Sequence, residues 1–374
     1  MRQVARDFGV TLYTVQRWVR RAQGKRLDRV DWEDRSSVPI QIPHRTSTTI
    51  ERRILSIRKQ LRERSSLGEY GAVAIHRELQ GQGVQHCPAI RTIGRILERR
   101  GVLDGRRRKR RPPPPPGWYL PQVAAGKAEL DSFDTIEGLA IRNGPHLTIL
   151  TGVSLIGGLI TVWPERNIIA KTVVEKLIEH WRFLGVPRYA QFDNDNRFQG
   201  PKQHRDVVGR VSRLCLNLGV TPVFAPPNET GFQAAIESLN GRWQAKVWSR
   251  FEHKSLRGLK TRSARFLAAD RERRAARIEA APPRQPFPKR WRLDLQKPPR
   301  GTIVYIRRTD SKGRVKLLGH HFKVDTHWLH RLIRVEVQLN AQRIRFFALR
   351  RRAATSQPML AETPYELPDR PFNE

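Results

Sequence analysis

The order of apolar segments in the middle of the chain restricts the fold more than any other feature. Three short segments with the pattern of β-strands come first, at 129–135, 146–154 and 158–163. Helical and strand patterns then alternate as helix, strand, helix, strand and helix. This order favours an antiparallel meander extended by parallel crossover units. We therefore predict a mixed sheet with helices packed against it over 118–250.

Three carboxylates occupy special places in this pattern. Asp131 lies in the first strand, Asp193 at the carboxyl end of a later strand, and Glu237 near the start of the last helix. In an RNase H-like core, which has this element order, these three positions converge. Converging carboxylates repel one another unless cations bind between them. The pattern predicts a catalytic site in which Asp131, Asp193 and Glu237 hold two Mg²⁺ or Mn²⁺ ions, an arrangement suited to phosphodiester chemistry.

Charge indicates the class of partner. The chain has 71 Lys and Arg residues against 35 Asp and Glu, a net charge of +36, so we expect it to bind nucleic acid. The longest uncharged run, 147–163, is shorter than the ~20 apolar residues of a membrane span. We predict two strands there and no membrane partner. Cys87 and Cys215 are far apart and support neither a disulfide framework nor a zinc finger. A cytoplasmic, nucleoid-associated protein is expected.

Two helical units ahead of the predicted core are typical of DNA-binding modules. At 1–27 the spacing of small, turn and apolar residues fits a helix-turn-helix, although no helix precedes the pair as such motifs usually require. Thr11 can cap its second helix. That helix would turn three side chains outward: Gln16, Arg17 and Arg20. A second helix-turn-helix at 46–105 would present Arg91 and Arg95 to DNA. A solvated basic face is the competing interpretation.

Linkers separate these units. A polar linker is expected at 28–45, and a basic run followed by five prolines at 106–117 marks another boundary. The basic run would lie on DNA phosphates through Arg106, Arg107, Arg108, Lys109 and Arg110.

The segments after the core are predicted from composition and alternation. A basic helical linker without a clean apolar stripe is expected at 251–290. Short alternating runs at 291–350 indicate a small β-barrel, and 351–374 has the composition of a disordered acidic tail. The predicted fold class is multidomain α+β, with helix-turn-helix units, an RNase H-like α/β catalytic core with a mixed sheet, and a small C-terminal barrel.

The residues around the carboxylates resemble a known family. Asp193, Asn194 and Phe198 match an Asp-Asn-Gly-x-x-Phe motif, and Glu237 with Asn240 matches a helix-borne Glu followed by Asn. Over most of the predicted core the chain resembles the retroviral-integrase-type catalytic core of DDE transposases, such as those of bacterial insertion sequences. The resemblance implies metal-dependent cleavage of a strand at a transposon end and attack of the freed 3′-hydroxyl on target DNA.

Departures from the family pattern leave alternatives open. Asp195 stands where the motif has glycine and adds a fourth carboxylate. The interval between the second and third carboxylates is longer than usual, and we place the excess at 199–206. Asp134 competes with Asp131 for the first position. Because these two side chains point to opposite faces of one strand, only one can serve. The family's Leu-Asp spacing from the strand start favours Asp131.

The resemblance also implies partners. These are double-stranded DNA, as transposon ends and as target, and further copies of the chain, because paired ends require at least two catalytic cores. An ATPase helper is a further partner to test for. The rival interpretation is a catalytically silent, transposon-derived DNA-binding or regulatory protein. A ribonuclease H would leave the basic DNA-binding regions unexplained.

Overall fold

The computed structural model describes residues 1–33, 46–103, 116–201, 204–229, 231–351 and 354–373. The chain divides into two compact units, Met1–Arg53 and Ile54–Glu374, which are described separately. Most of the two predicted linkers lies outside the described residues, and so do Arg106, Arg107, Arg108, Lys109 and Arg110.

The first unit contains two short helices joined by a tight turn. Helices α1 and α2 and the 3-10 helix η1 span Arg2–Asp7, Leu12–Ala22 and Leu27–Arg29. Gly9, in the turn, has a φ of 61°, a conformation that glycine adopts without steric cost. The side chain of Thr11 accepts a hydrogen bond from the backbone N–H of Thr14 over 3.2 Å. The predicted cap of α2 is therefore confirmed.

Three further helices form the segment predicted as the second helical unit. They are α3 (Thr48–Arg64), α4 (Ala72–Gly81) and α5 (Ile90–Arg99). Each has an apolar face at helical spacing, represented by the buried side chains Ile57, Ile75 and Ile93. Gly83, with a φ of 68°, reverses the chain after α4.

The core sheet follows the predicted order. Its strands are β1 (Leu130–Ala140), β2 (His146–Ser154), β3 (Ile160–Glu165), β4 (Tyr189–Phe192) and β5 (Thr221–Phe224). The associated helices are α6 (Pro121–Ala124), α7 (Ala170–Leu184), α8 (Asn196–Gln199), α9 (Arg210–Asn217) and α10 (Ala234–Trp243). Strands β1 to β3 are antiparallel, β4 and β5 run parallel to β1, and the spatial order is β5-β4-β1-β2-β3. This confirms the predicted meander with parallel extensions and is consistent with an RNase H-like core.

Different helices cover the two faces of this sheet. On one face Phe133 of β1 packs in the same cluster as Trp181 of α7. On the other face Ile136 of β1 packs in the same cluster as Ile236 and Trp243 of α10. Because successive side chains of a strand point to opposite faces, this part of β1 turns its odd-numbered residues toward α7 and its even-numbered residues toward α10.

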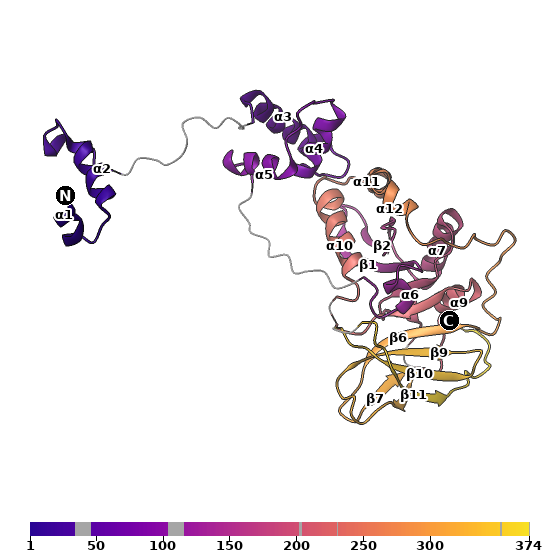
Figure 1. Ribbon diagram of the computed structural model, residues 1–374. Helices are drawn as coiled ribbons and strands as arrows, with labels where there is room; N and C mark the ends of the chain where they lie inside the picture. The colour runs from indigo at the N-terminus through magenta and orange to yellow at the C-terminus, as the bar shows by residue number, and fades with distance from the viewer. Residues whose placement is uncertain (34–45, 104–115, 202–203, 230, 352–353, 374) are drawn as a thin grey trace. The chain divides into compact units, whose positions relative to one another are not determined.

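The C-terminal strands continue the core sheet. They are β6 (Thr302–Arg308), β9 (Leu332–Gln338), β10 (Arg343–Ala348) and β11 (Met359–Pro364), while β7 (Arg314–Leu317) and β8 (His320–Lys323) form a separate hairpin. β6 pairs in parallel with β5, so the described residues form one nine-stranded sheet, whose C-terminal strands are yellow in Figure 1. The sheet has open edges at β3 and β11, and the small β-barrel expected at 291–350 is not confirmed. The pairing with β6 satisfies backbone groups that would otherwise form an exposed edge at β5.

Strand β11 lies where a disordered tail is expected from the sequence. It pairs with β10, and Arg345 of β10 donates a hydrogen bond from Nε to Glu362 of β11 over 2.7 Å. Composition alone misses this strand, because the positive charges that balance its acidic residue come from the neighbouring strand.

The predicted helical linker belongs to the core packing. Its helices are α11 (Leu256–Arg273) and α12 (Ala275–Glu279), and a π-helical segment, η2 (Gln244–Trp248), precedes them. α11 packs along β3 through a buried face made by Leu259, Ser263, Phe266 and Asp270. Two of these four residues are polar, so the buried face of α11 does not appear as an apolar stripe in the sequence. None of the helices in the described ranges combines the length and apolar character that crossing a membrane requires.

Candidate functional site

Asp131 and Asp134 lie on opposite faces of β1. In the sheet Asp131 is opposite Ser154 of β2, and Asp134 is opposite Thr151. Asp131 therefore faces α7, together with Phe133, whereas Asp134 faces α10. Since α10 carries Glu237, only Asp134 shares a face of the sheet with the helix-borne carboxylate.

Asp131 is buried in an ion pair. Its side chain is 1% exposed, and Arg284 donates from Nη2 to Oδ1 over 2.6 Å and from Nη1 to Oδ2 over 2.9 Å. Ser154 Oγ donates to Oδ1 over 2.7 Å, and Trp181 Nε1 donates to Oδ2 over 3.2 Å. These bonds occupy both oxygens of the carboxylate with donors from the protein itself.

The charges around Asp131 also favour a structural role. Burial alone would raise the pKa of Asp131, but the Arg284 guanidinium outweighs burial and holds this pKa below its usual range. His180 Nε2 lies 3.8 Å from Oδ2 of Asp131. Burial lowers the pKa of His180 to about 4, so its imidazole is neutral at pH 7. Arg284 is therefore the cation that balances Asp131.

The carboxylate of Asp134 accepts hydrogen bonds from β1 and α10, and a residue of β2 orients the donor on α10. Asn240 Nδ2 donates to Asp134 Oδ2 over 2.8 Å, and the backbone N–H of Thr135 donates to Oδ1 over 2.8 Å. Thr151 Oγ in turn donates to Asn240 Oδ1 over 2.7 Å, which fixes the orientation of the Asn240 amide. This chain of hydrogen bonds aligns the carboxylate of Asp134 on the face of the sheet that α10 covers.

The electrostatic surroundings of Asp134 identify its acidic neighbours. Burial is the largest cause that raises the pKa of Asp134 to about 6, and the negative charges of Asp193 and Glu237 raise it further. Hydrogen bonds from Thr135 and Asn240 act in the opposite direction. The negative charges of Asp193 and Glu237 thus both act on Asp134, and we call these three residues the carboxylate cluster.

A tight turn after β4 positions Asp193. Its Oδ1 accepts a hydrogen bond from the backbone N–H of Asp195 over 2.9 Å. Asp195 is the N-cap of α8 and accepts from the backbone N–H of Arg197 over 2.8 Å. The Arg197 guanidinium also donates to both oxygens of Asp195, over 2.8 Å each. The fourth carboxylate of the sequence motif is therefore a helix cap paired with a cation.

Glu237 lies in the first turn of α10, where the helix dipole favours a carboxylate. The flanking side chains Ile236 and Leu239 are 0% exposed and fix the helix against the sheet. Glu237 itself is exposed. It shares a face of the helix with Asn240, three residues later, so one helical surface supplies both a carboxylate and the amide that holds Asp134.

The donor set of the carboxylate cluster fits a hard divalent cation. Asp134, Asp193 and Glu237 offer only oxygen atoms, which Mg²⁺ and Mn²⁺ prefer. Burial is the largest cause of the raised pKa of Asp134, and the negative charges of Asp193 and Glu237 add a repulsion that a bound cation would relieve. Among the described residues no three acidic, His or Cys side chains already converge as a preformed metal centre. A cation would have to draw the three carboxylates together.

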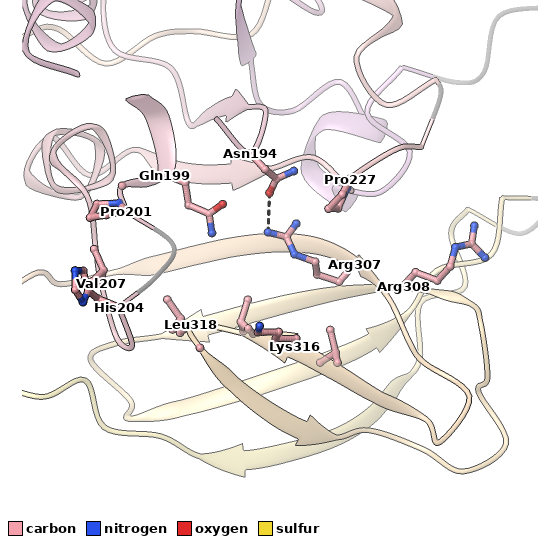
Figure 2. Close-up of a pocket in the computed structure, with 14 residues that line it drawn as sticks. Asn194, Gln199, Pro201, His204, Val207, Pro227, Arg307, Arg308, Lys316 and Leu318 are labelled. Atoms are coloured by element: carbon pink, nitrogen blue, oxygen red, sulfur yellow. Dashed lines mark hydrogen bonds between the residues drawn. The ribbon is translucent and has the colours of Figure 1, made fainter. Parts of the chain in front are cut away.

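Two arginines from distant segments bind residues next to Asp193 and on β1. Local sequence patterns do not predict these contacts. Arg307 of β6 donates from Nη2 to Asn194 Oδ1 over 2.8 Å, as Figure 2 shows, and from Nη1 to the carbonyl of Ala225 over 3.1 Å. Arg284 reaches Asp131 from the segment after α12. Neither pairing has a local sequence signal, because the partners are more than a hundred residues apart along the chain.

The predicted DNA-binding side chains are accessible where the structure describes them. Gln16, Arg17 and Arg20 are exposed on α2, and Arg91 and Arg95 are exposed on α5. Exposure is what a contact with DNA requires, and their role in DNA binding stays a prediction.

Comparison with known proteins gives distant structural likenesses. No protein-family model and no curated protein matches the chain. The catalytic core domain of BIV integrase is similar with a TM-score of 0.29 and 16% identity, over 37% of this chain and 81% of that chain. The HTLV-2 integrase catalytic core domain in complex with magnesium has a TM-score of 0.28 and 12% identity, over 37% and 82%. A simian T-cell lymphotropic virus intasome in complex with PP2A regulatory subunit B56 gamma has a TM-score of 0.35 and 13% identity, over 81% and 95%.

Proposed function

We propose that this protein is a DDE-type polynucleotidyl transferase, a transposase or integrase that cleaves DNA strands and joins them to target DNA with Mg²⁺ or Mn²⁺. The observation that carries the proposal is the hydrogen bond from Asn240 to Asp134, which joins β1 to the helix that carries Glu237 on one face of the sheet. The negative charges of Asp193 and Glu237 both act on Asp134 as well. In this assignment Asp134 takes the position that the sequence pattern gives to Asp131.

Some residues of the proposed site would bind the cations, and others would orient the carboxylates that bind them. Asp134, Asp193 and Glu237 would hold the cations, which when bound supply charge stabilisation at the attacking and leaving oxygens. Asn240 orients Asp134, and the turn capped by Asp195 orients Asp193. Asp131 ties β1 to the segment after α12 through Arg284 and takes no part in the chemistry.

DNA is the proposed substrate and target because of the charge of the chain. A net charge of +36 favours a polyanion over any small neutral substrate. The exposed cations of α2 and α5 would bind the duplex through its phosphates, and further copies of the chain would assemble on paired ends. An ATPase helper remains an expectation from the sequence alone.

A strand-joining assay tests the proposal. The full chain is incubated with labelled duplexes that carry the DNA flanking its gene, in Mg²⁺ or Mn²⁺, and cleaved and joined products are separated on a denaturing gel. We expect metal-dependent products from the wild type and none from Asp134→Asn, Asp193→Asn or Glu237→Gln, all of which retain duplex binding. Sequence-specific binding of the flanking DNA without any cleavage in either metal would establish the silent DNA-binding protein instead.

A further inference from the structure

A pocket opens between the core and the C-terminal hairpin, beside the turn that follows β4. Its volume is about 510 Å³, within the range of small-ligand sites. Asn194, which directly follows Asp193, forms part of one wall, and Lys316 and Leu318, at the end of the β7–β8 hairpin, form part of another (Figure 2). The pocket therefore lies beside the turn that positions one of the proposed metal-binding carboxylates.

Two cations of this pocket lack acidic partners. The Arg307 guanidinium donates to the side-chain oxygen of Asn194 and to the carbonyls of Ala225 and Ile306, all of them neutral acceptors. Lys316 is exposed, and within the described residues its Nζ makes no hydrogen bond or ion pair. Arg308, which also lines the pocket, is by contrast paired with Glu229. An uncompensated guanidinium beside an unpaired ammonium favours an anionic ligand.

The remaining lining is mostly apolar. Val315, Leu317 and Leu318 are buried in the core behind this lining, with exposures of 3%, 3% and 9%. Val207 and Pro227 complete this wall. A ligand that fills the pocket needs an anionic part for the two cations and a flat or apolar part for this wall, which is the composition of a nucleotide.

We propose that this pocket binds one unstacked nucleotide of a single-stranded DNA segment, with its phosphate on Arg307 and Lys316 and its base against Val207 and Pro227. The proposal rests on the polynucleotide substrate proposed above and specifies where a strand lies beside the turn that follows β4.

Binding of a short oligonucleotide to the full chain tests this inference in EDTA, where no metal-dependent chemistry occurs. The probe is fluorescein-labelled thymidine trinucleotide, and anisotropy gives the Kd. Lys316→Ala should weaken binding about 5- to 10-fold, the loss of one phosphate contact at low salt. The matched control is Lys323→Ala, which removes the same charge from an exposed position of β8 outside the pocket and should change the Kd less than about twofold. Equal losses in the two variants would overturn the pocket assignment.

Two further probes separate the ligand chemistries. An abasic trinucleotide with the same phosphates should bind several-fold more weakly than the thymidine probe, and equal affinity would reduce the site to an anion site. Thymidine 5′-monophosphate should compete only at much higher concentration, and equal competition would assign the pocket to free nucleotides. A failed joining assay with an intact difference between Lys316→Ala and Lys323→Ala would therefore contradict the proposed function and leave the pocket assignment standing.

Discussion

Asn240 donates a hydrogen bond over 2.8 Å from Nδ2 to Oδ2 of Asp134, and this bond joins the helix that carries Glu237 to strand β1. The same amide accepts a hydrogen bond from Thr151. Thr151 and Asn240, which are 89 residues apart along the chain, therefore hold the Asp134 carboxylate in a fixed direction.

Asn240→Ala should impair metal binding by releasing Asp134. We expect about 10- to 100-fold weaker activation by Mg²⁺ in the joining assay, the usual cost of losing a residue that orients a metal ligand. The hydrogen bond from Asn240 lowers the pKa of Asp134, so its loss should also shift the acidic limb of the pH–rate profile upward. Asn217→Ala on α9, whose amide donates only to the carbonyl of Arg213, is the control and should leave both properties unchanged. An unshifted pH profile in Asn240→Ala would argue for a purely structural role.

Asp134→Asn and Asp131→Asn should separate activity from stability. Asp134→Asn should abolish joining and leave the melting temperature unchanged or higher, because it removes a charge that its neighbours repel. Asp131→Asn should lower the free energy of unfolding by about 3–5 kcal/mol, since it leaves Arg284 without a counter-charge in a buried place. Thermal denaturation and the joining assay, run on both variants, measure the two effects. A fully stable but inactive Asp131→Asn would return the first metal-ligand position to Asp131.

Stability should depend on pH through Asp134 when no metal is present. Its pKa in the folded protein is raised to about 6. The protonated form is therefore favoured by folding, and the stability that this contributes is present below the unfolded pKa of about 4 and lost as pH rises through about 6. In EDTA the wild type should lose stability relative to Asp134→Asn between about pH 4 and pH 6. Urea denaturation of both proteins across this interval measures the difference, and parallel curves would contradict the raised pKa.

Mg²⁺ should restore the stability that the wild type loses as pH rises in EDTA, and should not have this effect on Asp134→Asn. A cation and a proton compete for the same carboxylate, so the apparent affinity for Mg²⁺ should fall about tenfold from pH 7 to pH 5. The shift of the melting temperature on titration with Mg²⁺ reports this affinity without any DNA. Asp134→Asn is expected to show little stabilisation at either pH.

The buried pair of Asp131 and Arg284 should behave as a coupled unit. Asp131→Leu and Arg284→Met should each destabilise the fold by about 3 kcal/mol or more, because each leaves one buried charge unpaired. The double variant should recover more than half of that loss, since it removes both charges together. Urea denaturation of the four proteins gives the coupling energy. Additive losses would show that the pair contributes nothing beyond its separate hydrogen bonds.

Arg91→Ala with Arg95→Ala should weaken duplex binding without affecting the folded core. Both side chains are exposed on α5. If each contacts a phosphate, the slope of log K against log salt should become shallower by about 2, and affinity at low salt should fall about tenfold or more. Arg99 and Arg100 lie at and just beyond the end of the same helix and provide the matched double variant. Equal losses from both pairs would indicate a general charge effect and no specific docking surface on α5.

The sequence by itself determines the elements and the chemical inventory of this protein. The periods of its apolar residues predict β1 to β5, with α7 and α9 between them, because strand and helix patterns are local properties of the chain. The same reasoning places Asp193 at the end of a strand and Glu237 at the start of a helix. It also shows that Asp131 and Asp134 point to opposite faces, since alternation along a strand needs no tertiary information.

Only the tertiary structure decides which face of β1 meets the helix that carries Glu237. α10 packs on the even-numbered face of β1, which brings Glu237 and Asn240 to Asp134, and Arg284 arrives from beyond α12 to neutralise Asp131. The parallel pairing of β6 with β5 is also set by tertiary contacts. It makes the C-terminal strands part of the core sheet and creates the pocket beside Asn194. Such pairings depend on contacts between segments far apart along the chain, and the burial and charge that they create are absent from any local pattern.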